Sequence, residues 1–415
     1  MVNFNWQKYP VYKSSGVEWL GEIPEHWEMK RLKFISHLVY GDSLGSENRE
    51  DGNINVYGSN GMIGLHSKAN TLSPVIIVGR KGSFGKIQYS LFPCFCIDTA
   101  YLIDQRKTKQ NLKWLCYALQ ILELDKISQD TGVPGLSREK AYQKLVPVSP
   151  LSEQQAIANF LDEKLAQIDE YIAKKQRIIE LLKEQKTVII NQAVTKGINP
   201  DVSMKYSGIE WLGEVPEHWE VLPAFAVFKE QCVINRDLVE KNLLSLSYGK
   251  IIRKSFTNNF GLLPESFETY QIVTPGNIIL RLTDLQNDKR SLRVGLVKEK
   301  GIITSAYLCL NPQNVIPEYV YTLLHIYDIL KIFYSMGSGV RQNMKFKDLK
   351  RLPITFPPVS EQKEIVSFIE KKLEKIERSL TVIEKEIKLI QEYRTTLISE
   401  TVTGKIDVRK YHPPQ

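Results

Sequence analysis

The sequence is poor in cysteine, and its few cysteines form no framework. Five of the 415 residues are cysteines, an odd number scattered along the chain. Disulfide scaffolds are short and dense in cysteine, so we expect reduced thiols and a reducing compartment. Cys94 and Cys96 lie two apart, but no second cysteine or histidine pair stands at zinc-binding spacing. We therefore expect no metal site.

Long apolar segments are also missing. No run of about 18 apolar residues is present, so a membrane-spanning helix is not expected. The opening MVNFNWQKYP has no basic segment followed by an apolar core, so a secretory signal is not expected either. Hydrophobic residues make up 43% of the chain and charged residues 25%, which excludes the disordered class. These features indicate a cytoplasmic globular protein of two or three domains.

Catalytic motifs are absent as well. The sequence has no Asn-Pro-Pro-Tyr or Asn-Pro-Pro-Phe methyltransferase motif, no glycine-rich adenosylmethionine loop and no Walker A loop. GRKGSFGK at 79–86 fails as a Walker A loop, because Phe84 replaces the glycine and Ile87 follows the lysine. The Glu-x-Lys triplet in EKEIK at 384–388 lies in a helical pattern and is expected to be a solvated face. We expect no catalytic residue and no bound cofactor in this chain.

A repeat dominates the organisation of the chain. SGVEWLGEIPEHWE at 15–28 returns as SGIEWLGEVPEHWE at 207–220, with an offset of 192. SEQQAIANFLDEKLAQID, which begins at 152, returns as SEQKEIVSFIEKKLEKIE from 360, with an offset of 208. The predicted division is an N-terminal motif (1–28), a first variable block (29–150), a central helix (151–198), a linker with the second motif (199–220), a second variable block (221–357), a C-terminal helix (358–403) and a tail (404–415).

The two variable blocks differ strongly but keep echoes of each other. IDTAYLI at 97–103 matches ITSAYLC at 303–309, so we expect one fold with two different surfaces. The tail TGKIDVRKYHPPQ resembles the internal linker TKGINPDVSMKY. This likeness predicts a pseudo-twofold, nearly circular layout in which the two ends of the chain meet.

Both helical segments carry a heptad seam of period 3.5. The seam residues are Leu165, Ile168, Ile172, Ile179, Leu182 and Ile189 in the first and Leu373, Ile376, Leu380, Ile383, Ile387, Ile390 and Leu397 in the second. Lys175 and Lys186 interrupt the first seam, and Arg394, equivalent to Lys186, interrupts the second.

The helix ends are also predicted from the sequence. We expect Ser152, in a capping box with Gln155, and Ser360 as N-caps, and Gly197 and Gly404 at the ends. An antiparallel pair within one chain is the favoured arrangement; a dimerisation coiled coil between two chains is the alternative.

Positive charge is concentrated in the variable blocks. The first block holds 16 Lys/Arg and 10 Asp/Glu, for +6, and the second holds 18 and 11, for +7. The rest of the chain holds 21 and 26, for −5, which gives the total of +8. Phosphate contacts need Lys and Arg, so two basic modules on a slightly acidic frame predict contact with DNA at two places.

This order of motif, variable block and P-x-SEQ helix, occurring twice, resembles the specificity subunits of type I restriction–modification systems. The resemblance covers essentially the whole chain, and YGSNGMIG at 57–64 is similar to a segment of that family's target-recognition domains. It implies an α+β fold with two mixed α/β target-recognition domains joined by two long antiparallel coiled-coil helices.

The resemblance also implies a function. Each block would read one half of a bipartite, asymmetric DNA site, and the helices would set the non-specific gap. Two modification subunits would methylate adenine with S-adenosylmethionine, and restriction subunits would add an ATP-driven, Mg-dependent endonuclease, in a prokaryotic cytoplasm. A coiled-coil scaffold that binds no DNA, and a stand-alone nuclease or methylase, are the rival functions.

Candidate DNA contacts fall in loops rich in Gly, Arg and Lys. Arginine pairs with guanine, Asn and Gln suit adenine, and Lys suits phosphate. The candidates are Arg80, Lys81, Ser83, Lys86, Ser137, Arg138 and Lys140 in the first block and Arg281, Asn287, Lys289, Arg290, Arg293, Ser338, Arg341, Gln342, Asn343 and Lys345 in the second.

The aromatic and histidine positions of the two motifs need a different explanation. They recur almost unchanged beside divergent blocks, which argues against base reading. Packing of the frame or docking of a partner subunit are the two interpretations. The residues are Trp19, His26, Trp27, Trp211, His218 and Trp219.

Overall fold

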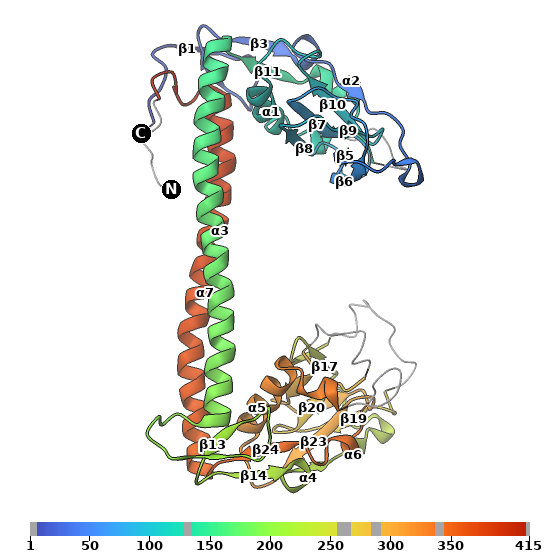
Figure 1. The fold of residues 1–415 in the computed structure, drawn as a ribbon, viewed down its shortest axis with the longest axis vertical. Coiled ribbons are helices and arrows are strands. Elements are labelled where there is room, and N and C mark those ends of the chain that lie inside the picture. The colour runs from blue at the N-terminus through green and yellow to red at the C-terminus, as the bar shows by residue number, and fades with distance from the viewer. Residues whose placement is uncertain (1–5, 128–133, 255–266, 284–291, 337–343, 412–415) are drawn as a thin grey trace. The chain divides into compact units, whose positions relative to one another are not determined.

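The computed structural model describes residues 6–127, 134–254, 267–283, 292–336 and 344–411 (Figure 1). The chain divides into two compact units. Unit 1 comprises residues 1–176 and 384–415, and unit 2 comprises residues 177–383. Each unit therefore contains one variable block and a segment of each long helix.

The first block is built on a four-stranded antiparallel sheet. Its strand order is β4 (Val39–Tyr40), β10 (Ala100–Asp104), β7 (Val75–Gly79) and β8 (Ile87–Ser90). Every residue of β7 and β10 is buried, which explains their continuous apolar sequences. Helix α1 (Leu112–Gln120) covers β7 and β8.

Smaller elements complete the first block. A second sheet has β5 (Ile54–Gly58) between β6 (Gly61–His66) and β9 (Phe95–Cys96). The remaining elements are β3 (Glu28–Arg31), η1 (Leu32–Phe34), η2 (Ser46–Asn48), η3 (Leu124–Lys126), α2 (Arg138–Gln143) and β11 (Leu145–Val148), with β3 paired to β11. The N-terminal motif before the block forms β1 (Tyr12–Ser14) and β2 (Glu22–Pro24), which pair with each other.

The second block repeats this topology. Its main sheet runs β15 (Phe228–Glu230), β23 (Leu308–Pro312), β20 (Ile278–Leu280) and β21 (Val294–Leu296), and α5 (Pro317–Ile329) follows β23 as α1 follows β10. The prediction that the two blocks share a fold is therefore confirmed.

The second block has its own smaller elements. They are β14 (Glu220–Pro223), α4 (Ala224–Val227), β16 (Val233–Ile234), η4 (Arg236–Leu238), β17 (Leu244–Ser247), β18 (Lys250–Arg253), β19 (Gln271–Val273), β22 (Gly301–Ile303), η5 (Ile332–Ser335), α6 (Phe346–Leu349) and β24 (Pro353–Phe356). The linker and second motif before the block form β12 (Met204–Tyr206) and β13 (Glu214–Pro216), which pair with each other.

The two long helices form as the heptad seams predict. Helix α3 (Leu151–Lys196) has 46 residues and α7 (Val359–Val402) has 44. Gly197 and Gly404 follow them with φ of +79° and +76°, the left-handed conformation that ends helices and that glycine adopts without strain. The predicted ends are confirmed.

The predicted N-caps are wrong. The helices begin at Leu151 and Val359, one residue before each serine, and Ser152 and Ser360 lie inside the first turn. The amide of Gln154 donates to the Pro150 carbonyl at 2.9 Å, so the proline occupies the capping position. Gln155 closes no capping box, because its side chain binds Asn111 and Asn159 instead.

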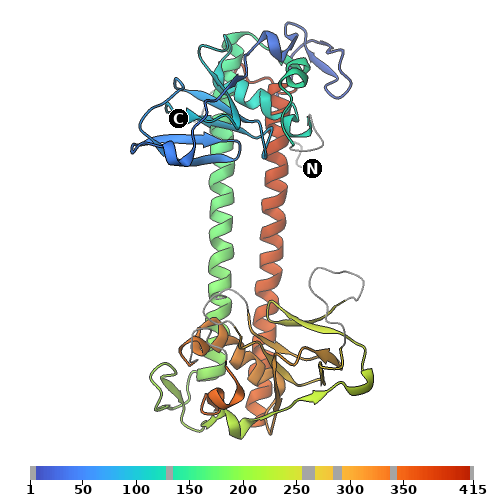
Figure 2. The ribbon, with the colours of Figure 1, turned by 90° about the vertical axis from the view of Figure 1, so that its right-hand side faces the viewer.

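Within each unit the helix segments run antiparallel, as expected (Figure 2). In unit 1, Arg394 pairs with Asp169 at 3.3 Å, and in unit 2, Lys186 pairs with Glu377 at 2.5 Å. These two ion pairs are equivalent under the 208-residue offset. The charged residues that interrupt the seams are therefore matched by an acid on the facing helix.

The first and last segments that the structure describes meet in unit 1, as the circular layout predicts. The Asp407 amide donates to the Gln7 carbonyl at 2.7 Å, and the Tyr12 hydroxyl donates to the Gly404 carbonyl at 3.1 Å. Ile406 and Val408 of the tail are buried in the core of unit 1. The tail thus packs on the first motif.

Candidate nucleic-acid interface

The repeated motifs hold the helix ends through one glutamate each. In unit 1, Glu153 lies 2.6 Å from Nε2 of His26 and accepts a hydrogen bond from Nε1 of Trp27 at 3.0 Å. In unit 2, Glu361 lies 2.8 Å from Nε2 of His218 and accepts from Nε1 of Trp219 at 3.0 Å. Both glutamates stand in the first turn of a long helix, where the helix dipole favours negative charge.

The same tryptophans pack against the opposite helix ends. A Cβ added to Gly404 would lie 3.2 Å from Trp27 and 2.4 Å from Pro24, and one added to Gly197 would lie 3.3 Å from Trp219. Trp27 and Trp219 are fully buried. Each motif therefore joins the start of one long helix to the end of the other, which gives these side chains a role in the frame.

The first tryptophan of each motif behaves differently. Trp19 is 58% exposed and Trp211 is 43% exposed, although Trp211 also packs edge-on against Tyr327 at 4.9 Å. They are available to a partner, and docking at Trp19 and Trp211 stays a prediction.

The glutamine of each SEQ triplet was missed by the sequence analysis. Oε1 of Gln154 accepts from the Asn111 amide at 2.9 Å, and Oε1 of Gln362 accepts from the Ile316 amide at 2.8 Å. Both glutamines are fully buried, and the residues that they bind lie just before α1 and α5. The repetition of SEQ was the signal that could have identified them, because it is the same tie in both halves.

In the first block, two predicted DNA-contact segments come together. The loop of the β7–β8 hairpin carries Arg80, Lys81, Ser83 and Lys86, and its Arg80 carbonyl accepts from the Leu136 amide at 2.8 Å. This hydrogen bond brings the loop beside Arg138, the first residue of α2. The loop is therefore a β-hairpin loop that closes onto the segment before α2 rather than a freely solvated turn.

Tyr40 lies at the centre of this junction and was not among the predicted residues. The guanidinium carbon of Arg80 lies 4.6 Å from the Tyr40 ring centre, and that of Arg138 lies 4.7 Å from it. Burial, and then the neighbouring Tyr40, raise the pKa of Tyr101 to about 12, while Arg80 and Arg138 act to lower it. The two arginines thus make this edge electropositive.

The other predicted DNA-contact residues of the first block differ in their exposure to solvent. Lys81, Ser83 and Lys140 are exposed, and so is Lys86, whose ammonium donates to the Asn60 carbonyl at 2.9 Å. The prediction that Ser137 contacts DNA is corrected by its burial. Its hydroxyl accepts a hydrogen bond from the Lys140 amide, and the residue is the N-cap of α2. A capped and buried hydroxyl has no face left for DNA.

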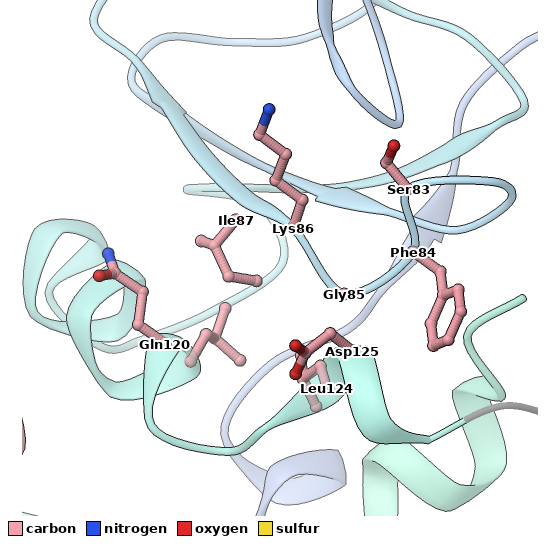
Figure 3. A pocket seen from close by; sticks show the side chains of 9 residues that line it. Ser83, Phe84, Gly85, Lys86, Ile87, Gln120, Leu124 and Asp125 are labelled. Carbon is pink, nitrogen blue, oxygen red and sulfur yellow. The ribbon is translucent and has the colours of Figure 1, made fainter. Parts of the chain in front are cut away.

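A cavity of about 390 Å³ lies under the same loop (Figure 3). Leu119 and Gln120 of α1 line it with Leu124 and Asp125 of η3 and with residues 83–87 of the hairpin. The labelled Lys86 side chain points away from Asp125 in this view. The cavity therefore presents a carboxylate rather than a cation, and we assign no ligand to it.

The second block joins the equivalent segments in the same way. The Met344 amide donates to the Leu282 carbonyl at 2.9 Å, as Leu136 does to Arg80 in the first block. Arg281 is half-buried and Lys345, just before α6, is exposed. Seven predicted residues lie outside the described residues: Asn287, Lys289, Arg290, Ser338, Arg341, Gln342 and Asn343.

Arg293 is a second correction. It is fully buried, and Nη1 donates to the carbonyls of Arg281 and Thr283 at 3.1 and 2.8 Å, while its amide donates to Asp328 at 2.5 Å. The guanidinium therefore fixes the chain around Arg281 from inside the domain. Its positive charge suggested a DNA contact, but the fold places it in the interior.

The second block has an exposed tyrosine that the sequence analysis did not select. Tyr248 and Gly249 form the tip of the β17–β18 hairpin with φ of +46° and +75°. Two positive φ values are typical of a two-residue type I′ turn, where Asn-Gly is the usual pair and a bulky residue is strained. Tyr248 is 84% exposed, and the hydroxyl of Tyr321 fixes the tip by donating to the Gly249 carbonyl at 3.1 Å.

The described residues contain no group of three His, Cys, Asp or Glu side chains that could hold a metal ion. Cys94 and Cys96 are both buried, and burial raises the pKa of the Cys94 thiol. In the same part of the chain, no helix is both long and apolar enough to cross a membrane.

Comparison with known proteins decides the family. The type I restriction modification DNA specificity domain matches twice, at residues 24–183 and 233–389. The chain belongs to this family of specificity subunits. Its members are the non-catalytic subunits of their systems, and each match covers most of one block and extends into the long helix that follows it.

Relatives of known name agree with this assignment. A Methanocaldococcus jannaschii protein named as an MjaX type I restriction enzyme specificity subunit is 24% identical over 94% of this chain and 96% of its own length. The MjaVIII specificity subunit of the same organism is 24% identical over 75% and 74% of the two chains. The EcoBI specificity subunit of Escherichia coli is 22% identical over 71% and 66%.

A solved structure shows the same fold. A chain from a structural study of complex assembly and conformational transition in a type I restriction–modification system superposes with a TM-score of 0.65. The match covers 92% of this chain and 99% of that chain at 11% identity.

Proposed function

We propose that this specificity subunit reads a bipartite, asymmetric DNA site and directs adenine methylation and cleavage by partner subunits. The observation that carries the proposal is the pair of blocks with one sheet topology and different side chains at equivalent loops. In both, the loop after the third strand of the sheet order is hydrogen-bonded to the segment before a short helix. One scaffold with two different edges suits a site with two different halves.

Charge supports contact with DNA at both edges. The blocks carry +6 and +7, whereas the remainder of the chain carries −5. Lys and Arg at these edges supply the sequence-independent affinity, and the side chains that differ between the blocks supply the choice of bases. The long helices, which join the blocks along the chain, set the gap between the half-sites.

The two copies of the motif provide two equivalent surfaces on which partner subunits can dock. Each unit presents the same motif, with an exposed Trp19 or Trp211 and a His–Trp–Glu cluster in which only the tryptophan is fully buried. Two equivalent surfaces suit two copies of one modification subunit, with S-adenosylmethionine on that subunit. Restriction subunits that use ATP and Mg would then complete the nuclease.

Methylation-motif sequencing tests the proposal. The chain is expressed with its neighbouring modification subunit in cells that lack other adenine methylases, and the methylated adenines are mapped. We expect a single gapped, two-part motif, and replacing residues 29–150 with the block of another subunit should change one part only. If both parts change together, one block does not read one half-site and the bipartite assignment is wrong. If no motif appears although the two proteins co-purify, the chain is a scaffold and the whole proposal is wrong.

A further inference from the structure

Three elements of the first block converge on one aromatic ring. Strand β4 supplies Tyr40, the end of β7 leads to Arg80, and Arg138 opens α2. Both guanidinium carbons lie within 5 Å of the ring centre, at 4.6 and 4.7 Å. A cation over a tyrosine ring is held by the ring quadrupole, so each guanidinium has a preferred orientation.

Further contacts fix the junction. Nη1 of Arg80 donates to the Asp98 carbonyl at 2.8 Å. The rings of Tyr40 and Tyr101 lie 5.1 Å apart, and the hydroxyl of Tyr101 donates to the Leu136 carbonyl at 3.3 Å. The two arginines are therefore oriented before any ligand binds, which reduces the side-chain entropy lost on binding.

The charge of the pair is largely uncompensated. Among the described residues, Arg138 has one ion pair, with Glu139 at 3.8 Å, and Arg80 has none. Two guanidinium groups on one ring repel each other, so the junction suits a ligand with strong hydrogen-bond acceptors. The exposed Lys81 and Lys140 are nearby and can contact phosphate, because an ammonium group acts as a point charge and needs no fixed orientation for this.

A planar guanidinium group in a fixed orientation matches the acceptor pattern of guanine better than that of the other bases. Arginine donates in bidentate fashion to O6 and N7 of guanine in the major groove. We propose that Arg80 and Arg138, oriented by Tyr40, recognise guanine in the half-site of the first block. The inference rests on the proposed function and adds the base and the residues that select it.

Within the described residues, the second block has other side chains at the two equivalent positions. The matching backbone hydrogen bonds place Leu282 where the first block has Arg80, and Phe346, a buried residue, where it has Arg138. Guanine recognition by this junction therefore belongs to one half-site, and it contributes to the asymmetry of the whole site.

The test uses the full chain with its modification subunit and maps methylated adenines for five forms: the wild type, Arg80→Lys, Arg138→Lys, Tyr40→Ala and Tyr40→Phe. The lysine variants keep the charge but lose the fork. We expect each to lower the preference for a G·C pair in the first half-site by roughly 10- to 100-fold, with the second half unchanged. Tyr40→Ala should relax the same position, and Tyr40→Phe, which keeps the ring, should preserve it.

The outcomes separate the inference from the function beneath it. A wild-type motif whose first half, assigned by exchange of residues 29–150, contains no G·C pair overturns the guanine inference alone. Equal loss of methylation on every target variant marks the arginines as phosphate contacts and also overturns it. If the wild type yields no motif, the proposed function fails and this inference fails with it.

Discussion

Two regions of this molecule repeat in different ways. One is the frame, formed by the two motifs and the long-helix ends that they join. The other is the pair of reading edges, where the loop at Arg80 or Leu282 meets the segment before α2 or α6. In the frame, both sequence and contacts repeat: His26, Trp27 and Glu153 are matched by His218, Trp219 and Glu361 with nearly equal distances. At the reading edges only the backbone contact repeats, while Arg80 gives way to Leu282.

This difference shows which positions are constrained. The frame must meet the same requirement twice, because each motif joins two helix ends around one glutamate and one fully buried tryptophan. The edges need only the same path of the main chain, so their side chains are free to differ. Under the proposed function, side chains at one edge can therefore change while the frame stays the same.

The largest effect that would test this comparison is loss of a frame tryptophan. Trp27→Ala and Trp219→Ala should each lower the free energy of unfolding by about 3–5 kcal/mol, because both side chains are fully buried. Trp19→Ala is the matched control, since that tryptophan is 58% exposed and its loss should shift stability by about 0.5 kcal/mol or less.

Denaturant unfolding of the purified full chain measures these three variants. The two buried tryptophans should behave alike if the frame is truly repeated. A loss of stability confined to one of them would mean that the two motifs share a sequence but not a structural role. The conclusion that the frame is repeated would then be wrong.

Replacing the glutamates of the frame tests the same repetition, with a smaller expected loss of stability. Glu153→Ala leaves the Nε1 proton of Trp27 without its acceptor inside the core, which costs about 1–3 kcal/mol. Glu361→Ala should cost less, because Glu153 also accepts from the hydroxyl of Tyr9 at 3.0 Å. Glu153→Gln, which retains an acceptor oxygen, is the control, and thermal unfolding compares all three. An equal loss for the two alanine variants would show that Tyr9 adds nothing.

The sequence predicted the frame better than the edges, for a physical reason. Heptad spacing and glycine at helix ends are local signals, so the helices and their ends at Gly197 and Gly404 could be predicted. The N-caps at Ser152 and Ser360 failed because Pro150 and Pro358 already fill that position, with glutamine side chains closing the turn.

Burial at the edges depends on contacts that are distant in the sequence. Arg293 and Ser137 carry polar groups that suit DNA, yet the fold uses both inside the domain. Tyr40 gains its importance only because β4, β7 and α2 converge, and no spacing in the sequence records that convergence.

The hairpin tip at Tyr248 offers a test in which stability and recognition move in opposite directions. Tyr248→Gly removes a side chain from a left-handed position, so stability should rise by up to about 1 kcal/mol. If the exposed ring contacts DNA, the same change should weaken recognition of the second half-site only. Tyr248→Phe keeps the strain and the ring and is the control, with melting temperature and methylation mapping as the two measurements. Unchanged methylation would mean that the ring is a bystander.

The smallest expected effect lies in the two equivalent ion pairs between the helices. Lys186–Glu377 and Arg394–Asp169 are largely exposed, so each should contribute about 0.2–1 kcal/mol in a double-mutant cycle, decreasing with added salt. Lys186 lowers the pKa of Glu377 below its ordinary value. A carboxyl with a lowered folded-state pKa stabilises the fold above its unfolded pKa, and this contribution is lost as the pH falls through the folded value. The Lys186–Glu377 coupling measured at pH 7 should therefore persist as the pH falls to the ordinary glutamate pKa of about 4.3 and disappear only at lower pH. A coupling that is unchanged at low pH would show that the two side chains stabilise the helices through packing of their aliphatic stems rather than through charge.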